Sequence, residues 1–123
     1  MGLASNQARL NVLTLRKADL EARLLTLSNQ TQRIATEQAQ AIADKSNAIT
    51  TYIANSADQT VSFENTQAYM DYETAMSKLE IAQNKLDQQQ KTAETELKAV
   101  QNEQEQVKKL VETNAKKSFA YFN

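Results

Sequence analysis

The chain has 123 residues and a net charge of −1, and it contains one glycine and no proline, cysteine or histidine. This composition excludes disulfides and thiol chemistry, and it leaves almost no residues that end helices or form turns between strands. Basic residues are not gathered on one stretch, so the electrostatic signature of a nucleic-acid-binding protein is absent. We therefore expect a single all-α domain, residues 1–123, that does not bind nucleic acid.

Large apolar residues recur at heptad spacing along the first arm, at Leu3, Leu10, Leu13, Leu20, Leu24, Leu27 and Ile34. A repeat of this period predicts a helix that packs along another helix. After Ile34 the spacing slips by one residue to Ile42, Ile49 and Ile53, which predicts a local change of supercoil within a continuing helix. We expect this helix to run from about residue 3 to about residue 55.

A cluster of Asn, Ser, Asp and Thr between residues 55 and 62 marks the place where the chain can reverse. Short polar side chains compete with a helix by bonding to their own backbone. Ser56 and Ser62 are candidate helix caps there. We expect a turn at about residues 56–62, between arms of similar length, and the alternative is one unbroken helix.

The second arm, about residues 63–118, carries an apolar repeat at alternating steps of three and four residues, with Gln83, Gln90 and Gln104 in the remaining steps. Together the two arms predict a long antiparallel, coiled-coil-like hairpin. Lys17 and the glutamines are expected to set register and partner choice, or alternatively to face a wet channel or a second subunit. The predicted intramolecular seam comprises Leu10, Leu13, Leu20, Leu24, Leu27, Ile34, Tyr69, Tyr72, Met76, Leu79, Leu86, Leu97, Val100, Val107 and Val111.

The first arm is apolar on a second side, which faces away from this seam. A hairpin covers only one side of each helix, and a helix that is apolar on two sides is normally buried. The chain is therefore expected to pack into a larger helical assembly of copies of itself. The aromatic residues near the C-terminus are expected to dock as well, because they would promote aggregation if exposed. The predicted oligomer interface comprises Ala8, Val12, Leu15, Ala18, Ala22, Leu25, Phe119, Tyr121 and Phe122.

No group of residues points to catalysis. The chain lacks His, Cys and Trp, has no glycine-rich phosphate loop, and spreads its carboxylates along exposed faces. We expect no enzymatic activity, no cofactor, no metal site and no small-molecule substrate. No apolar run approaches the roughly 18 residues of a membrane span, and the N-terminus lacks the pattern of a cleaved signal peptide.

The chain is small, free of Cys and rich in Ala, Gln, Asn and Thr, with an apolar helix over Leu3–Leu27 and a long C-terminal helix through Phe122. In this layout it resembles the axial subunits exported by bacterial flagellar and type III secretion systems, and other secreted helical-hairpin filament subunits. In those families the terminal helices pack together in the filament wall. The resemblance implies a location outside the cell or at its surface, reached without a cleaved signal, in preference to the cytoplasm.

The leading hypothesis is a structural subunit that self-assembles into a helical filament or a similar homopolymer. The competing hypothesis is a coiled-coil binding module, such as an adaptor, chaperone or secreted effector, whose second apolar side engages a different protein. A helix lying on a lipid surface fits less well, because acidic and basic residues balance on the polar faces.

Overall fold

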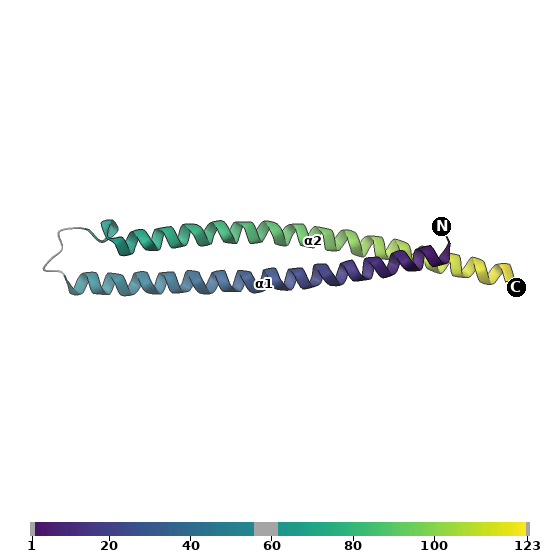
Figure 1. The fold of residues 1–123 in the computed structure, drawn as a ribbon, viewed down its shortest axis with the longest axis horizontal. Coiled ribbons are helices and arrows are strands. Elements are labelled where there is room, and N and C mark those ends of the chain that lie inside the picture. Colours follow the sequence, from purple (N-terminus) through teal and green to yellow (C-terminus); the bar gives the residue numbers. More distant parts are fainter. Residues whose placement is uncertain (1, 56–61, 123) are drawn as a thin grey trace. The chain divides into compact units, whose positions relative to one another are not determined.

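The structure, a computed structural model, describes residues 2–55 and 62–122, with side chains described as far as residue 117. Helix α1 spans Leu3–Ala54, a short 3₁₀ helix η2 spans Phe63–Asn65, and helix α2 spans Gln67–Phe122 (Figure 1). The two long helices pack against each other, and no strand occurs in the described residues. The predicted all-α hairpin is thereby confirmed, and the alternative of one unbroken helix is wrong.

The chain divides into two compact units, each of which contains a stretch of both long helices. Residues 1–26 and 89–123 form the terminal unit, and residues 27–88 form the central unit. Apart from Ser62, the turn predicted at residues 56–62 lies outside the described residues. The second long helix begins at Gln67, after η2, and continues to Phe122, whereas the sequence placed this arm at about residues 63–118.

Both long helices are free of proline and of internal glycine, and they accommodate many threonines. A threonine hydroxyl competes with helical backbone bonds unless it finds a partner within the helix. Here the hydroxyls of seven threonines each donate to the carbonyl oxygen four residues earlier, at Thr14, Thr26, Thr31, Thr36, Thr50, Thr51 and Thr95. The polar residues of this sequence are therefore compatible with uninterrupted helix.

Thr66 caps the start of α2. Its backbone is extended, and its Oγ1 accepts a hydrogen bond from the Tyr69 N–H at 3.3 Å, which satisfies one of the free donors of the first turn. The candidate cap Ser62 precedes η2 and makes no capping bond. Its hydroxyl instead accepts a hydrogen bond from the Asn65 side-chain amide at 3.1 Å. The candidate cap Ser56 lies outside the described residues.

The terminal unit is held by a narrow apolar seam between its two helix stretches. Leu13, Leu20, Val100 and Val107 are buried together, and Leu10, Leu97 and Val111 pack against them. The buried residues recur every seven positions in each helix, as a coiled-coil seam requires. Asn6 extends the same column of α1 by one heptad, and it is a polar residue that is nevertheless buried.

Two ion pairs at the edge of this seam define the antiparallel register of the terminal unit. Arg9 donates to Glu103 through Nε at 3.0 Å and also through Nη2, and Arg16 Nη2 lies 3.7 Å from Glu96 Oε2. A step of one heptad forward in α1 therefore corresponds to a step of one heptad back in α2. Both pairs are exposed, so each contributes at most about 1 kcal/mol to stability.

The central unit continues the heptad without the predicted slip. Ile34 and Leu86 are buried, and the Gln38 amide donates to Gln83 Oε1 at 3.3 Å. Beyond Ile34 the half-buried residues of α1 are Gln38, Ala41, Lys45, Ala48, Ile49 and Tyr52. Ile49 is half-buried, but Ile42 and Ile53 are exposed, so the predicted shift of the seam is wrong at those two isoleucines. The spacing is preserved because two alanines occupy the column that leucine and isoleucine occupy earlier in α1.

Leu13 and Leu15 provide a matched test of this seam, because they lie two residues apart on opposite sides of α1. Leu13 is 1% exposed, whereas Leu15 is 73% exposed. We expect Leu13→Ala to lower the free energy of unfolding by about 2–5 kcal/mol, since it leaves a cavity in the seam. Leu15→Ala should change it by less than about 0.5 kcal/mol. Urea unfolding of dilute protein followed by circular dichroism measures both, and equal losses would contradict the assigned seam.

Candidate functional site

The second apolar side of α1 is exposed in the structure, on the side opposite the seam. We call it the back face, and it comprises Ala8, Val12, Leu15, Ala18, Ala22 and Leu25. All six residues are exposed, and the largest exposed fractions are 73% for Leu15, 65% for Leu25 and 53% for Val12. The returning helix of the same chain leaves these side chains in contact with solvent, because it packs only on the side of Leu13 and Leu20.

The other predicted interface residues lie at the end of α2. The helix continues through this segment, but the side chains of Phe119, Tyr121 and Phe122 lie outside the described part of the structure. The back face is therefore the part of the predicted interface whose surroundings the structure describes.

The structure places every residue of the predicted seam in a buried or half-buried position. The buried ones are Leu13, Leu20, Leu27, Ile34, Leu86, Val100 and Val107. The half-buried ones are Leu10, Leu24, Tyr69, Tyr72, Met76, Leu79, Leu97 and Val111.

Two of the polar residues at seam positions have polar partners. Gln104 donates to the Thr14 hydroxyl at 3.3 Å, and Lys17 lies 3.9 Å from the Glu21 carboxylate.

Five further exposed apolar residues lie outside the predicted interface, at Ile42, Ile53, Met70, Ile81 and Leu110. They lie singly along the helices, unlike the back face. Single exposed apolar residues are normal on a protein surface and need no partner. Of this set, only Ile81 stands out in the sequence as an apolar residue opposite the second arm's seam.

Four aromatic residues of the central unit form a continuous cluster. Phe63 of η2 packs edge-on against Tyr52 of α1 and Tyr69 of α2, with ring centroids 5.6 and 5.8 Å apart. Tyr72 extends the cluster, with its centroid 6.4 Å from that of Tyr69. The ammonium group of Lys45 lies over Tyr72, 4.5 Å from its centroid, in cation–π geometry. The cluster joins the end of α1 to the start of α2.

The pKa of Tyr69 is raised above its ordinary value of 10.0, first by a hydrogen bond with Glu73 and then by the negative charge of that carboxylate. Both effects favour the protonated phenol over the phenolate. The folded chain thus retains this proton to higher pH than the unfolded chain does. Tyr69 therefore weakens folding only as the pH rises above about 10.

Glu73→Gln tests the cause of this shift. The variant removes the charge but retains a hydrogen-bond acceptor, so the pKa of Tyr69 should fall toward its ordinary value. Titration of the Tyr69 ring carbons by NMR measures the change. Glu112→Gln removes a carboxylate elsewhere on α2 and serves as the control. A pKa of Tyr69 that is the same in Glu73→Gln as in the unaltered chain would contradict the assignment to Glu73.

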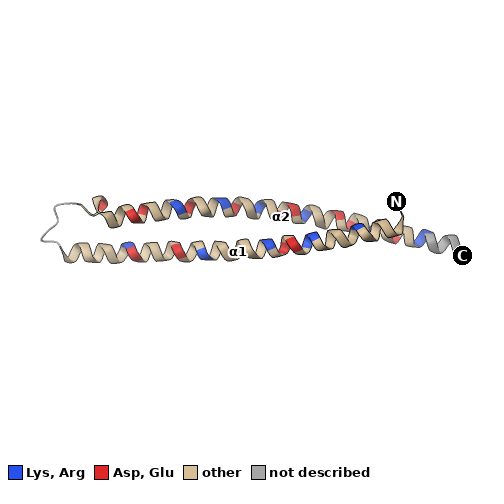
Figure 2. Ribbon diagram, viewed as in Figure 1, with Lys and Arg blue, Asp and Glu red and all other residues tan. Residues whose placement is uncertain are grey.

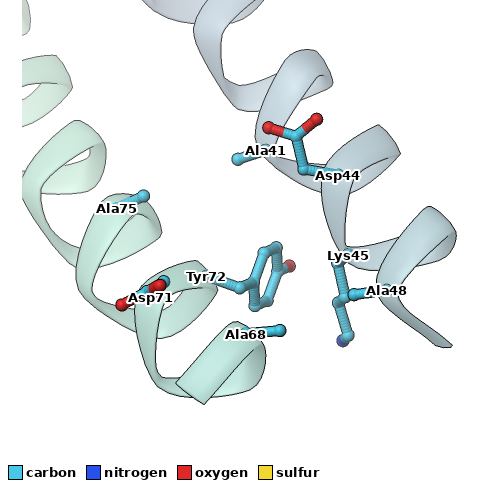
Figure 3. A pocket seen from close by; sticks show the side chains of 8 residues that line it. All are labelled: Ala41, Asp44, Lys45, Ala48, Ala68, Asp71, Tyr72 and Ala75. Carbon is cyan, nitrogen blue, oxygen red and sulfur yellow. The ribbon is translucent and has the colours of Figure 1, made fainter. Parts of the chain in front are cut away.

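The central unit contains two open hollows between its helix stretches, of about 360 and 420 Å³. Both are lined by Ala41, Asp44 and Ala75, so they form one elongated depression along the seam. We call this depression the alanine groove. Its floor contains Ala41, Ala48, Ala68 and Ala75, and Figure 3 shows Asp44 of α1 and Asp71 of α2 beside it. Ala41 and Ala48 take the place of the larger seam residues found earlier in α1, and their side chains do not fill the space between two helices.

Charges at the edges of the seam differ between the two units. Acidic and basic residues occur along both helices (Figure 2). In the terminal unit, Arg9 and Arg16 of α1 pair with glutamates of α2. The corresponding heptad positions of α1 in the central unit are Glu37 and Asp44, and these line the hollows beside Ala75. At these heptad positions α1 thus carries acidic residues, while the α2 side of the lining contains Asp71 and Lys78 as well as Ala75.

The described residues contain no group of three or more His, Cys, Asp or Glu side chains that could hold a metal ion. In that same part of the chain, neither helix has a stretch that is both long and apolar enough to cross a membrane. Two surfaces of the described residues are candidates for function, the back face in the terminal unit and the alanine groove in the central unit.

Comparison of the chain with protein-family models, with curated proteins and with solved structures finds no match.

Proposed function

We propose that this chain is a structural subunit that assembles with copies of itself, as a helical filament or a similar homopolymer, through the back face of α1. The observation that carries the proposal is the exposure of Leu15 and Leu25, at 73% and 65%, on the side of α1 opposite its seam. Burial of apolar surface contributes about 25 cal/mol per Å², so covering two leucines and Val12 favours association.

The spacing of the back face indicates that its partner is a helix. Ala8, Leu15 and Ala22 are one heptad apart, and so are Ala18 and Leu25. These two columns form a second coiled-coil seam along the same helix, made of small residues with a leucine in each column. Small residues allow close approach of a second backbone, and the leucines can insert between its side chains. The proposed contact is thus helix on helix.

The proposal assigns no catalytic step to the chain. The layout shared with exported axial subunits favours an exported filament as the form of the homopolymer. The competing function, a coiled-coil module that binds a different protein, would use the same exposed leucines. The two functions differ in a measurable way, because only the first makes the pure chain assemble.

Glutamate substitutions at the two exposed leucines test the proposal. The unaltered chain should assemble with rising concentration, as seen by light scattering and by negative-stain microscopy. Leu15→Glu combined with Leu25→Glu should abolish assembly and leave the helical circular dichroism unchanged, because neither side chain contributes to the seam.

Ile81→Glu is the matched control, since Ile81 is 67% exposed but lies outside the back face. It adds a similar charge at a similarly exposed apolar position and should leave assembly intact. Assembly of the double variant at the same concentration as the unaltered chain would contradict the proposal. A pure chain that stays monomeric throughout would instead support the binding module.

A further inference from the structure

We propose that the alanine groove of one copy receives the back face of α1 from a second copy. This inference rests on the proposed function and specifies the surface that the back face contacts. Three properties of the two surfaces support the match, namely shape, length and charge.

The shape of the groove suits a helix. The two hollows share three lining residues and follow one another along the seam, so the depression is elongated and not round. Alanines of both helices line it together with Tyr72, whose ring lies between the two helices in Figure 3. Amphipathic helices bind such grooves by inserting apolar side chains from one face.

The lengths of the two surfaces agree. Leu15 and Leu25 are ten residues apart, which corresponds to about 15 Å along a helix at about 1.5 Å per residue. On α1 the groove is lined from Glu37 to Ala48, eleven residues apart, or about 16 Å by the same rise. Both exposed leucines can therefore lie within the groove at the same time.

The charges of the two surfaces are opposite. Residues 8–25, which carry the back face, contain four basic and two acidic side chains, a net charge of +2. The helix segments that line the groove, residues 37–48 and 68–79, each contain two acidic and one basic side chain, a net charge of −2 together.

Arg9, Arg16 and Lys17 pair with Glu103, Glu96 and Glu21 of the same chain, so Arg23 is the basic side chain of residues 8–25 that is left for a partner. Arg23 has no ion-pair partner among the described residues, and neither does Glu37. Asp44 and Asp71 accept amide hydrogen bonds from Gln40 and Gln67, at 2.9 and 2.8 Å, and neutral amides do not cancel their charge. Lys45, the basic residue closest to the floor, is placed over the rings of Tyr69 and Tyr72.

Engineered cysteines test which surfaces meet, because the chain has no cysteine of its own. Leu15→Cys protein is mixed with a length-tagged Ala75→Cys protein and oxidised under conditions in which the unaltered chain assembles. We expect the disulfide between the two different variants to be the main cross-linked product. The control replaces the second partner by Ile81→Cys, which is exposed on the same helix but outside the groove, and should give little of it.

Each other product has a distinct meaning. Disulfides mainly between two Leu15→Cys chains would overturn the groove as the receiving surface and leave self-assembly in place. Assembly without a cross-link between Leu15→Cys and Ala75→Cys would do the same. Failure of the unaltered chain to assemble at any concentration would overturn the proposed function and this inference with it.

Charge variants provide a second, independent measurement. Asp44→Arg should cause loss of most of the Leu15–Ala75 cross-link, and so should Arg23→Glu. Combining the two reversals in one chain should restore it, because the opposite signs are re-established. The cross-link should also decrease as NaCl screens the charges. A cross-link unaffected by either single reversal would refute the electrostatic part of the match.

Discussion

The seven-residue spacing of fully buried side chains is the constraint on which this structure depends. Leu13 and Leu20 in α1, and Val100 and Val107 in α2, each occupy one position per two helical turns. A seam built in this way covers a narrow strip of each helix and leaves most of its circumference exposed. The described residues therefore bury few side chains, and most of each helix is exposed. This limitation gives the exposed leucines of the back face their significance.

The edges of the seam show how one repeat produces two different surfaces. Every arginine of the chain lies within the first 33 residues. Two of these arginines reach glutamates across the seam, and Arg9 does so with two donors of its planar guanidinium group. At the corresponding positions further along α1, Glu37 and Asp44 replace arginine and alanines line the opposite helix. The seam edge is thus bridged by side chains in the terminal unit and hollow in the central unit.

The sequence predicted the hairpin because leucine, isoleucine and valine at alternating steps of three and four have one stable arrangement, a helix against a helix. The prediction from sequence was wrong where small residues such as alanine occupy the heptad positions of the seam. Ile42 and Ile53 suggested a shifted seam, yet Ala41 and Ala48 continue the original heptad and the isoleucines are exposed. Alanine gives no periodic signal, since it is equally compatible with a seam and with a solvated face. The start of α2 also differs from the prediction, because a 3₁₀ helix follows Ser62 and the Thr66 hydroxyl caps the long helix.

The two candidate surfaces differ in the same way, because one could be predicted from the sequence and the other could not. The back face was predictable, because its leucines and valine are large and their distance from the seam follows from helical geometry alone. The alanine groove was not, because it requires the register that brings Ala41 and Ala48 beside Ala68 and Ala75. Within the central unit that register is accompanied by the burial of Ile34 and Leu86 and by the Gln38–Gln83 hydrogen bond.

The nature of the contact between copies determines what kind of assembly can form. A back face that met its own equivalent would be satisfied in a closed dimer, because each copy would bury its only such surface. A back face that meets a groove can also close a pair, if each copy places its back face in the groove of the other, whereas a single contact of this kind leaves one groove and one back face free. Contacts of this heterologous kind continue into a ring if the rotation closes and into a filament if it does not. The proposed match between the back face and the alanine groove is therefore compatible with a closed pair, a ring or a filament, and the rotation between copies decides among them.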